Sequence, residues 1–402
     1  MRLSGATGLH AERTRAMTMA ENNIPSMASL TAPLLGINEE LRAMQEERPI
    51  WKVRTYTGDE AWLVMGASEI KRLLVDRRLG RSHPDPANAP KYAPSPVFEQ
   101  IMAEFERHAE IRALLTPYFS RTSMRAMQPK VEATVAELVE TMLAGDPPAE
   151  LQKMLARPLA MRVLCELVGI PVADQELVGR LLHRMAGLGA GDGDATLGAY
   201  LTGIAAQRRA EPREDMISGL VAAGQTDERV ATLVAMLLFA GGESVATHIG
   251  FGVARLATDD ALREALSHDH ALIEPVVEEM LRTASHGGGA QPHYANADIE
   301  IAGVTIRAGD LVLPDFALAN FDARAFENPE VVDLTRSPNQ HLAFAHGSWH
   351  CLGAPLARME LRTVYTILFE RAPSIRLAVP LDELNRETDR LFSTMPELSI
   401  TW

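Results

Sequence analysis

Cysteine is scarce in this chain of 402 residues, which contains only Cys165 and Cys351. Two cysteines cannot build the disulfide framework of a small secreted protein, so a reducing cytoplasm fits the composition. Aromatic residues make up only 5%, and positive charge is in deficit, because 39 Lys and Arg face 53 Asp and Glu. The formal charge of −14 argues against a general affinity for nucleic acid or for an anionic membrane.

Long hydrophobic runs are also missing. The longest, residues 230–240, is interrupted by Thr232 and ends well short of the roughly 20 apolar residues that span a bilayer. The first 29 residues contain no apolar core of signal-peptide length. We therefore expect no membrane anchor, a flexible arm over residues 1–30 and a single domain over residues 31–402.

What the chain does have is a stretch, residues 344–360, that presents one thiol at the start of a helix. Gly347 and Gly353 permit backbone angles that other residues resist, and Pro355 suits a first helical turn. The residues that follow repeat apolar side chains at helical spacing. The helix dipole and nearby amides favour the thiolate at Cys351, which could then be a nucleophile, a metal ligand or a haem ligand.

Nine residues of this stretch form one pattern: Phe344, Gly347, Cys351, Gly353, Ala354, Leu356, Ala357, Arg358 and Glu360. The pattern resembles the haem-thiolate loop of the cytochrome P-450 superfamily in its soluble bacterial form. The resemblance implies that Cys351 is the axial ligand of haem b, where a thiolate pushes electron density onto iron and favours O–O cleavage. The alternatives are a buried structural cysteine, and a zinc site of His346, His350 and Cys351 that lacks a fourth ligand. Cys165 lies in an apolar run and is predicted to be a core residue.

Residues 227–257 predict one long helix, about 45 Å at 1.5 Å per residue. Ala240, Gly241 and Glu243 match a family segment that bulges to make room for bound oxygen, and Ser244 stands where that segment usually has threonine. The resemblance implies that Glu243 and Ser244 are the catalytic pair that delivers protons. The alternative is that Ser244 bonds back to a carbonyl one turn earlier.

Glu279 and Arg282 stand three residues apart on a predicted helix. Spacing alone predicts a surface pair worth a few tenths of a kcal/mol. In the family such a pair is buried and joined by a distant arginine, here Arg336, and the resemblance therefore implies a structural brace for the Cys351 loop.

His108 and Arg112 share one helix face because they are four residues apart. A solvated face is the simple interpretation, but the pair matches the family helix that contacts a haem propionate. The sequence departs from the family at His293, where a propionate-binding arginine is usual, and at Trp349, where His or Arg is usual. Trp349 can still donate one indole N–H, without charge.

The remaining predicted elements are a hairpin, six helices and three segments near the substrate. Two strands of a hairpin are expected at 50–56 and 61–65, with helices over 33–47, 99–115, 131–145, 156–170, 173–185 and 195–208. By resemblance, the loop over 79–98 covers the substrate, the glycine-rich connector 187–194 is a gate, and residues 391–395 reach toward the substrate.

Together these features predict a mainly α domain with a small β region, binding haem between the Ser244 helix and the Cys351 helix. The implied activity is that of a monooxygenase, which hydroxylates or epoxidises a small organic molecule of specialised metabolism, free or tethered to a carrier protein. Ferredoxin and ferredoxin reductase would supply electrons at a basic face formed by Arg107, Arg112, Arg121, Arg125, Arg358 and Arg362. Oxidative coupling or desaturation, and a non-catalytic haem protein, are the alternatives.

Overall fold

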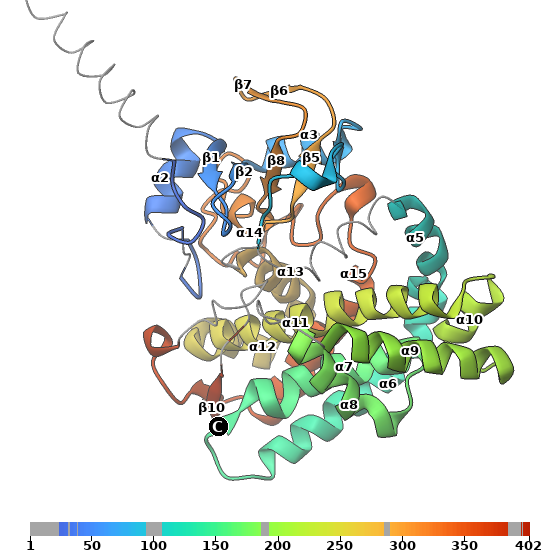
Figure 1. The fold of residues 1–402 in the computed structure, drawn as a ribbon. Coiled ribbons are helices and arrows are strands. Elements are labelled where there is room, and N and C mark those ends of the chain that lie inside the picture. The colour runs from blue at the N-terminus through green and yellow to red at the C-terminus, as the bar shows by residue number, and fades with distance from the viewer. Residues whose placement is uncertain are drawn as a thin grey trace, which may run out of the picture.

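The computed structural model describes residues 24–30, 33–37, 39–93, 107–185, 193–284, 290–384, 395 and 397–402. Its α-helices are α2 (Glu39–Glu47), α3 (Ala67–Val75), α5 (His108–Leu115), α6 (Arg121–Leu143), α7 (Arg157–Val168), α8 (Gln175–Met185), α9 (Gly193–Ala210), α10 (Met216–Ala222), α11 (Asp227–Thr258), α12 (Asp260–His268), α13 (Ile273–Thr283), α14 (Phe316–Ala319) and α15 (Ala354–Arg371). Its strands are β1 (Ile50–Arg54), β2 (Glu60–Val64), β3 (Leu79–Gly80), β4 (Ala149–Glu150), β5 (His293–Ala295), β6 (Ile299–Ile301), β7 (Val304–Ile306), β8 (Leu311–Pro314), β9 (Arg376–Leu377) and β10 (Ser399–Thr401). Figure 1 shows most strands gathered at the top, with the larger helices crossing below them.

The centre of the helical part is α11, whose observed end at Thr258 confirms the predicted helix to within a residue. The Thr226 side chain caps its first turn by accepting a hydrogen bond from the amide of Arg229. Four other helices, α7, α9, α13 and α15, pack around it. By length and composition α11 could cross a membrane, with a mean hydropathy of 1.6 over its most apolar stretch. Its burial among helices accounts for that composition equally well.

The largest sheet has the strand order β1-β2-β8-β5-β3. The predicted hairpin is confirmed, because β1 and β2 pair antiparallel, with Ile50 opposite Val64 and Arg54 opposite Glu60. The edge strand β3 pairs antiparallel with β5, placing Gly80 opposite Tyr294. This pairing brings the loop after residue 80 beside the strand that begins at His293.

Several predicted boundaries were wrong. Helix α6 begins at Arg121 rather than at 131, capped by the Ser120 side chain, and it continues through Pro129. Helix α2 begins at Glu39 rather than at 33. Of the helix predicted over 99–115, the described part is α5, which begins at His108.

The end of the predicted N-terminal arm packs against the folded chain. Met27 and Leu30 are buried in the same apolar cluster as Leu41 and Val53, and Ser26 forms a β-bridge with Arg54. Residues 24–30 therefore belong with the domain, whereas residues 1–23 lie outside the described part of the chain.

Candidate functional site

The thiol of Cys351 lies at the end of a tight loop that leads into α15. The amide of Cys351 donates to the carbonyl of Phe344 at 2.9 Å and closes this loop. Ala345 (φ 58°) and Gly347 (φ 62°) both adopt left-handed backbone angles inside it. Such angles are easy only for glycine, so Gly347 is required by conformation and Ala345 is strained. The loop geometry thus fixes where the sulfur stands.

Gly353 does not need its glycine for the backbone angle, which corrects the prediction from sequence. It is the N-cap of α15, with an ordinary φ of −76°. A Cβ added there would lie 3.7 Å from Cys351 Sγ, an ordinary van der Waals separation. The amides of Gly353 and Ala354 do face the sulfur, however, as its electrostatics show.

The balance of forces on Cys351 is opposite to the one expected from the helix dipole. Burial raises the pKa of the Cys351 thiol above its ordinary value, while hydrogen bonds from the Gly353 and Ala354 amides and the charges of Arg112 and Arg358 lower it. Desolvation is the larger effect on this sulfur, although the Cys351 residue as a whole is exposed. A bound metal cation deprotonates a coordinating thiol outright. The other cysteine, Cys165, is confirmed as a core residue, because it is fully buried and burial raises its pKa to about 12.

The zinc alternative gains no support from the geometry. Among the residues that the structure describes, no three His, Cys, Asp or Glu side chains gather as metal ligands. The described cysteines are both free, so no disulfide joins them.

Residues 240–244 of α11, where the resemblance predicts a bulge that makes room for bound oxygen, form part of a continuous α-helix. The Ser244 hydroxyl donates to the carbonyl of Ala240 at 2.7 Å, which is the back-bonded alternative. Glu243 forms an ion pair with Arg157 of α7, with 3.8 Å between Oε2 and Nε. Sequence reasoning missed Arg157 because it comes from a different helix.

Gly241 is explained by packing between α11 and α7. A Cβ at this position would lie 3.1 Å from both terminal methyl groups of Leu164. That separation is tighter than ordinary carbon contacts, so only glycine lets the two helices approach this closely.

The side chains expected at the propionate edge gather around one indole ring. The rings of His108 and Trp349 lie 4.2 Å apart between centroids, and those of His293 and Trp349 lie 5.2 Å apart at 88°. Arg112 donates to the carbonyl of His350 at 2.6 Å, so it also ties α5 to the cysteine loop. Burial lowers the pKa of His108 to about 4, and the charges of Arg112 and Arg81 add to this shift.

Arg81 is the member of this cluster that sequence reasoning missed. Its guanidinium carbon lies 5.3 Å from the centre of the Trp349 ring, and its Nη2 donates to the side-chain oxygen of Gln291. Burial alone lowers the pKa of Arg81 to about 9. The sequence placed Arg81 only within the predicted loop over 79–98, and that position does not predict contact with Trp349.

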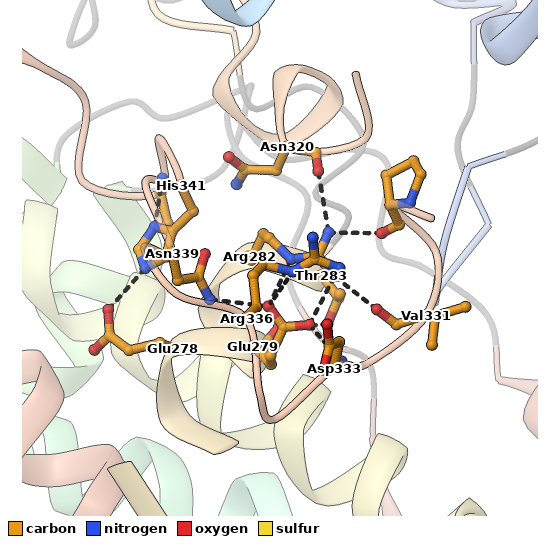
Figure 2. Close-up of polar contacts among 12 residues, drawn as sticks. Glu278, Glu279, Arg282, Thr283, Asn320, Val331, Asp333, Arg336, Asn339 and His341 are labelled. Atoms are coloured by element: carbon orange, nitrogen blue, oxygen red, sulfur yellow. Dashed lines mark hydrogen bonds and ion pairs between the residues drawn. The ribbon is translucent and has the colours of Figure 1, made fainter. Parts of the chain in front are cut away.

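Glu279, Arg282 and Arg336 lie in one buried hydrogen-bonded network (Figure 2). Arg282 is fully buried and donates to both carboxylate oxygens of Glu279, at 2.7 and 2.8 Å. The same carboxylate also accepts hydrogen bonds from Arg336, Asn339 and the Asp333 amide. Arg282 donates in addition to the carbonyls of Asn320, Pro329 and Val331. The pair therefore joins α13 to the chain segment that precedes the cysteine loop.

The neighbouring Glu278 forms a second brace that the sequence did not reveal. Its carboxylate accepts two hydrogen bonds from Arg358 of α15, at 2.6 and 2.8 Å, and one from His341 at 3.0 Å. Burial would raise the pKa of Glu278, but these hydrogen bonds and charges together lower it to about 2. Arg358 also lies over the Phe344 ring at 4.5 Å. Glu278 thus connects both ends of the cysteine loop to α13.

The expected basic face is partly neutralised. Arg107 pairs with Glu110, Arg358 with Glu278 and Arg362 with Glu274. Arg121 and Arg125 are exposed at the start of α6 and make no ion pair within the described residues. The connector 187–192, the segment 285–289 and residues 391–394 lie outside the described part of the chain, as do residues 94–98 of the predicted covering loop.

Comparisons with known proteins agree with this arrangement. A family model described as "Cytochrome P450" matches residues 203–372. Pentalenolactone synthase from Streptomyces exfoliatus is 36% identical over 403 residues, covering 95% of this chain and 100% of that protein. A mycinamicin IV hydroxylase/epoxidase from Micromonospora griseorubida is 35% identical and covers 89% of this chain and 94% of its own length. The solved structure of substrate-free PimD, a pimaricin epoxidase, has a TM-score of 0.86 and 44% identity, covering 95% of this chain and 100% of that one.

Proposed function

This chain belongs to the cytochrome P450 family and is an oxidoreductase of the monooxygenase type, and we propose that it hydroxylates or epoxidises a small organic molecule of specialised metabolism. Two similar proteins are named as epoxidases, one of them for pimaricin, a polyene macrolide antibiotic. A macrolide precursor is therefore the first substrate class to test. In the proposed reaction the substrate, dioxygen, two electrons and two protons give the oxygenated product and water.

The residues present fit a haem b group. Cys351 offers one sulfur ligand at the end of a loop held by the Cys351 amide and Arg112. The groups around Trp349 are the half-buried imidazole of His108, the buried imidazole of His293 and the buried Arg81 guanidinium, a set that suits the anionic edge of a porphyrin. When bound, the haem supplies dioxygen activation at an iron that the thiolate makes electron-rich. The Cys351 thiol is the observation on which the proposal depends most.

Glu243 and Ser244 are the proposed proton-delivery pair. A carboxylate can replenish a proton on a nearby hydroxyl or water when both are within hydrogen-bond reach. In this structure the Ser244 hydroxyl donates to the Ala240 carbonyl, so this hydrogen bond must break, by a turn about the Cβ–Oγ or the Cα–Cβ bond, before the hydroxyl can donate elsewhere. Serine makes that turn readily because it lacks the branching methyl of threonine. Arg157 holds Glu243 through a long ion pair that permits the carboxylate to move.

Electron delivery is proposed to use ferredoxin and ferredoxin reductase. Because Arg358 and Arg362 already pair with glutamates, the exposed Arg121 and Arg125 carry the available positive charge on this face. An acidic donor would be steered to them, and salt would weaken that attraction.

The first test asks whether Cys351 binds the haem iron as a thiolate. The reduced protein with carbon monoxide should give the red-shifted absorption band of thiolate-bound haem, and Cys351→Ala should remove it while Cys165→Ala retains it. A normal band in the Cys351 variant would refute the assignment. With a macrolide precursor, ferredoxin, reductase and ¹⁸O₂, the product should contain one ¹⁸O atom. A product that has lost two hydrogens without gaining ¹⁸O would instead indicate desaturation or coupling.

A further inference from the structure

Arg81 and His293 lie across from each other at the edge of the main sheet. Strands β3 and β5 pair antiparallel with Leu79 opposite Ala295 and Gly80 opposite Tyr294. Arg81 directly follows the last paired residue of β3, and continuing this register by one step would set it against His293. Opposed residues of an antiparallel pair project from the same face, with Cβ atoms about 5 Å apart. A long side chain at either position can therefore reach the same place.

Both side chains do meet the same ring. The Arg81 guanidinium carbon is 5.3 Å, and the His293 ring centroid 5.2 Å, from the Trp349 ring. Gln291 joins them further, because its side-chain oxygen accepts from Arg81 and its backbone carbonyl lies 2.8 Å from His293 Nδ1. Arg81 is 8% exposed and His293 is fully buried, so this is a built site rather than a surface contact.

The hydrogen bond at His293 decides what its other nitrogen can do. A backbone carbonyl only accepts, so Nδ1 must carry the proton in that contact. In the neutral ring Nε2 is then an acceptor, and it has no hydrogen-bond partner among the described residues. Burial and the Arg81 charge keep the pKa of His293 well below its ordinary value. His293 therefore cannot donate to an anion without first taking up a proton that its surroundings disfavour.

Arg81, by contrast, carries a guanidinium group whose N–H groups can only donate, and one of them donates to Gln291. A buried cation is stabilised when an anion binds beside it, because the two charges compensate each other's lost hydration. The Arg81 charge acts on both imidazoles beside Trp349, His108 and His293, and lowers the pKa of each.

We propose that Arg81 is the charged donor to a haem propionate in this protein, in place of an arginine at position 293. The positive charge thus comes from the residue that follows β3, and not from the residue at the start of β5. Gln291 and Trp349 hold the Arg81 side chain in position. This inference rests on the proposed haem-thiolate function.

The first test compares Arg81→Gln with Arg78→Gln in the purified holoprotein. Arg78 is a matched control, because it is an exposed arginine near the same strand, bound to Asp76. Loss of a charged hydrogen bond should speed haem transfer to apomyoglobin roughly tenfold in the Arg81 variant, equivalent to about 1.4 kcal/mol. Its midpoint potential should also fall, since removing a cation stabilises ferric over ferrous haem. Arg78→Gln should change neither quantity. Equal behaviour of the two variants would overturn the proposal.

The second test returns the cation to the opposite strand. In Arg81→Gln/His293→Arg, the haem-transfer rate and potential should return toward the wild-type values, whereas a purely structural role for Arg81 gives no recovery. A third measurement uses protohaem dimethyl ester, whose propionates carry no charge. With the ester, wild type and Arg81→Gln should lose cofactor at the same rate. A tenfold difference that persists with the ester would refute contact with a propionate, while the carbon monoxide band of the Cys351 ligand tests the haem-thiolate function separately.

Discussion

Replacement of Arg282 by alanine should be among the most damaging single changes in this protein. Arg282 has no exposed side-chain surface and bridges Glu279 to the carbonyls of Asn320, Pro329 and Val331. Removing one member of a buried ion pair costs about 3–5 kcal/mol, because the other charge is left uncompensated. Here Glu279 retains bonds from Arg336, Asn339 and the Asp333 amide, which moderates that loss.

The backbone carbonyls that lose Arg282 as a hydrogen-bond donor add to this loss of stability. Each loses a charged donor, and the Asn320 carbonyl lies in a buried contact, where an unsatisfied acceptor costs about 1–3 kcal/mol. Adding about 2 kcal/mol for this carbonyl to the lower end of the ion-pair range, about 3 kcal/mol, gives roughly 5 kcal/mol. A total stability of about 5–15 kcal/mol leaves little after such a loss. We therefore expect Arg282→Ala to yield little folded protein, with low haem content per chain.

Arg107→Ala is the matched control for this experiment. Arg107 and Glu110 are also three residues apart and joined by two hydrogen bonds of 2.8 Å, but the side chains are 55% and 41% exposed. Exposed pairs contribute about 0–1 kcal/mol, so this variant should remain near wild type. Denaturant midpoints and haem content would be measured for both.

Arg282→Lys keeps the experiment informative if the alanine variant does not fold. Lysine retains the charge but cannot reproduce the planar fork that binds both Glu279 oxygens and the carbonyls. It should give an intermediate loss of stability. If Arg282→Ala folds, retains haem and unfolds within about 1 kcal/mol of Arg107→Ala, the reasoning from burial is wrong.

Three further predictions concern protons, pH and electrons. Ser244→Ala should increase hydrogen peroxide released per product, and Ser244→Thr should decrease it, as measured against NADPH consumption; unchanged coupling in both would mean that protons arrive by another route. Burial raises the pKa of Glu360 from 4.5 to about 8, so the folded state holds this carboxyl group in its protonated form. The contribution of Glu360 to the free energy of unfolding should be fully present below pH 4.5 and be lost as the pH rises through 8. Glu360→Gln should remove this fall, worth a few kcal/mol at most, in unfolding experiments at pH 5 and 8.5; an equal slope in both proteins would contradict the assignment. Arg121→Glu should slow reduction by an acidic ferredoxin at low salt without changing substrate affinity, and stopped-flow rates that do not respond to salt would count against docking there.

Several parts of the protein could be predicted from the sequence because they depend on local spacing. The apolar pattern and the Thr226 cap define α11, and the predicted helix ends one residue from the observed end. The Glu279–Arg282 pair is fixed by its position on one turn of α13. The place of Cys351 at the start of α15 follows from Pro355 and the apolar repeat after it. The membership of the chain in its family then agreed with the resemblance carried by these same residues.

Other features depend on contacts between distant residues, and only the tertiary structure decided them. Spacing could not show that Glu278 binds both His341 and Arg358, or that Arg157 reaches Glu243. It also could not show that desolvation opposes the Gly353 and Ala354 amides and the Arg112 and Arg358 charges at Cys351, because Arg112 comes from a distant helix. Arg81 is the clearest case: the pairing of Gly80 with Tyr294, more than two hundred positions away, brings Arg81 and His293 to the same Trp349 ring, and no local pattern encodes that register.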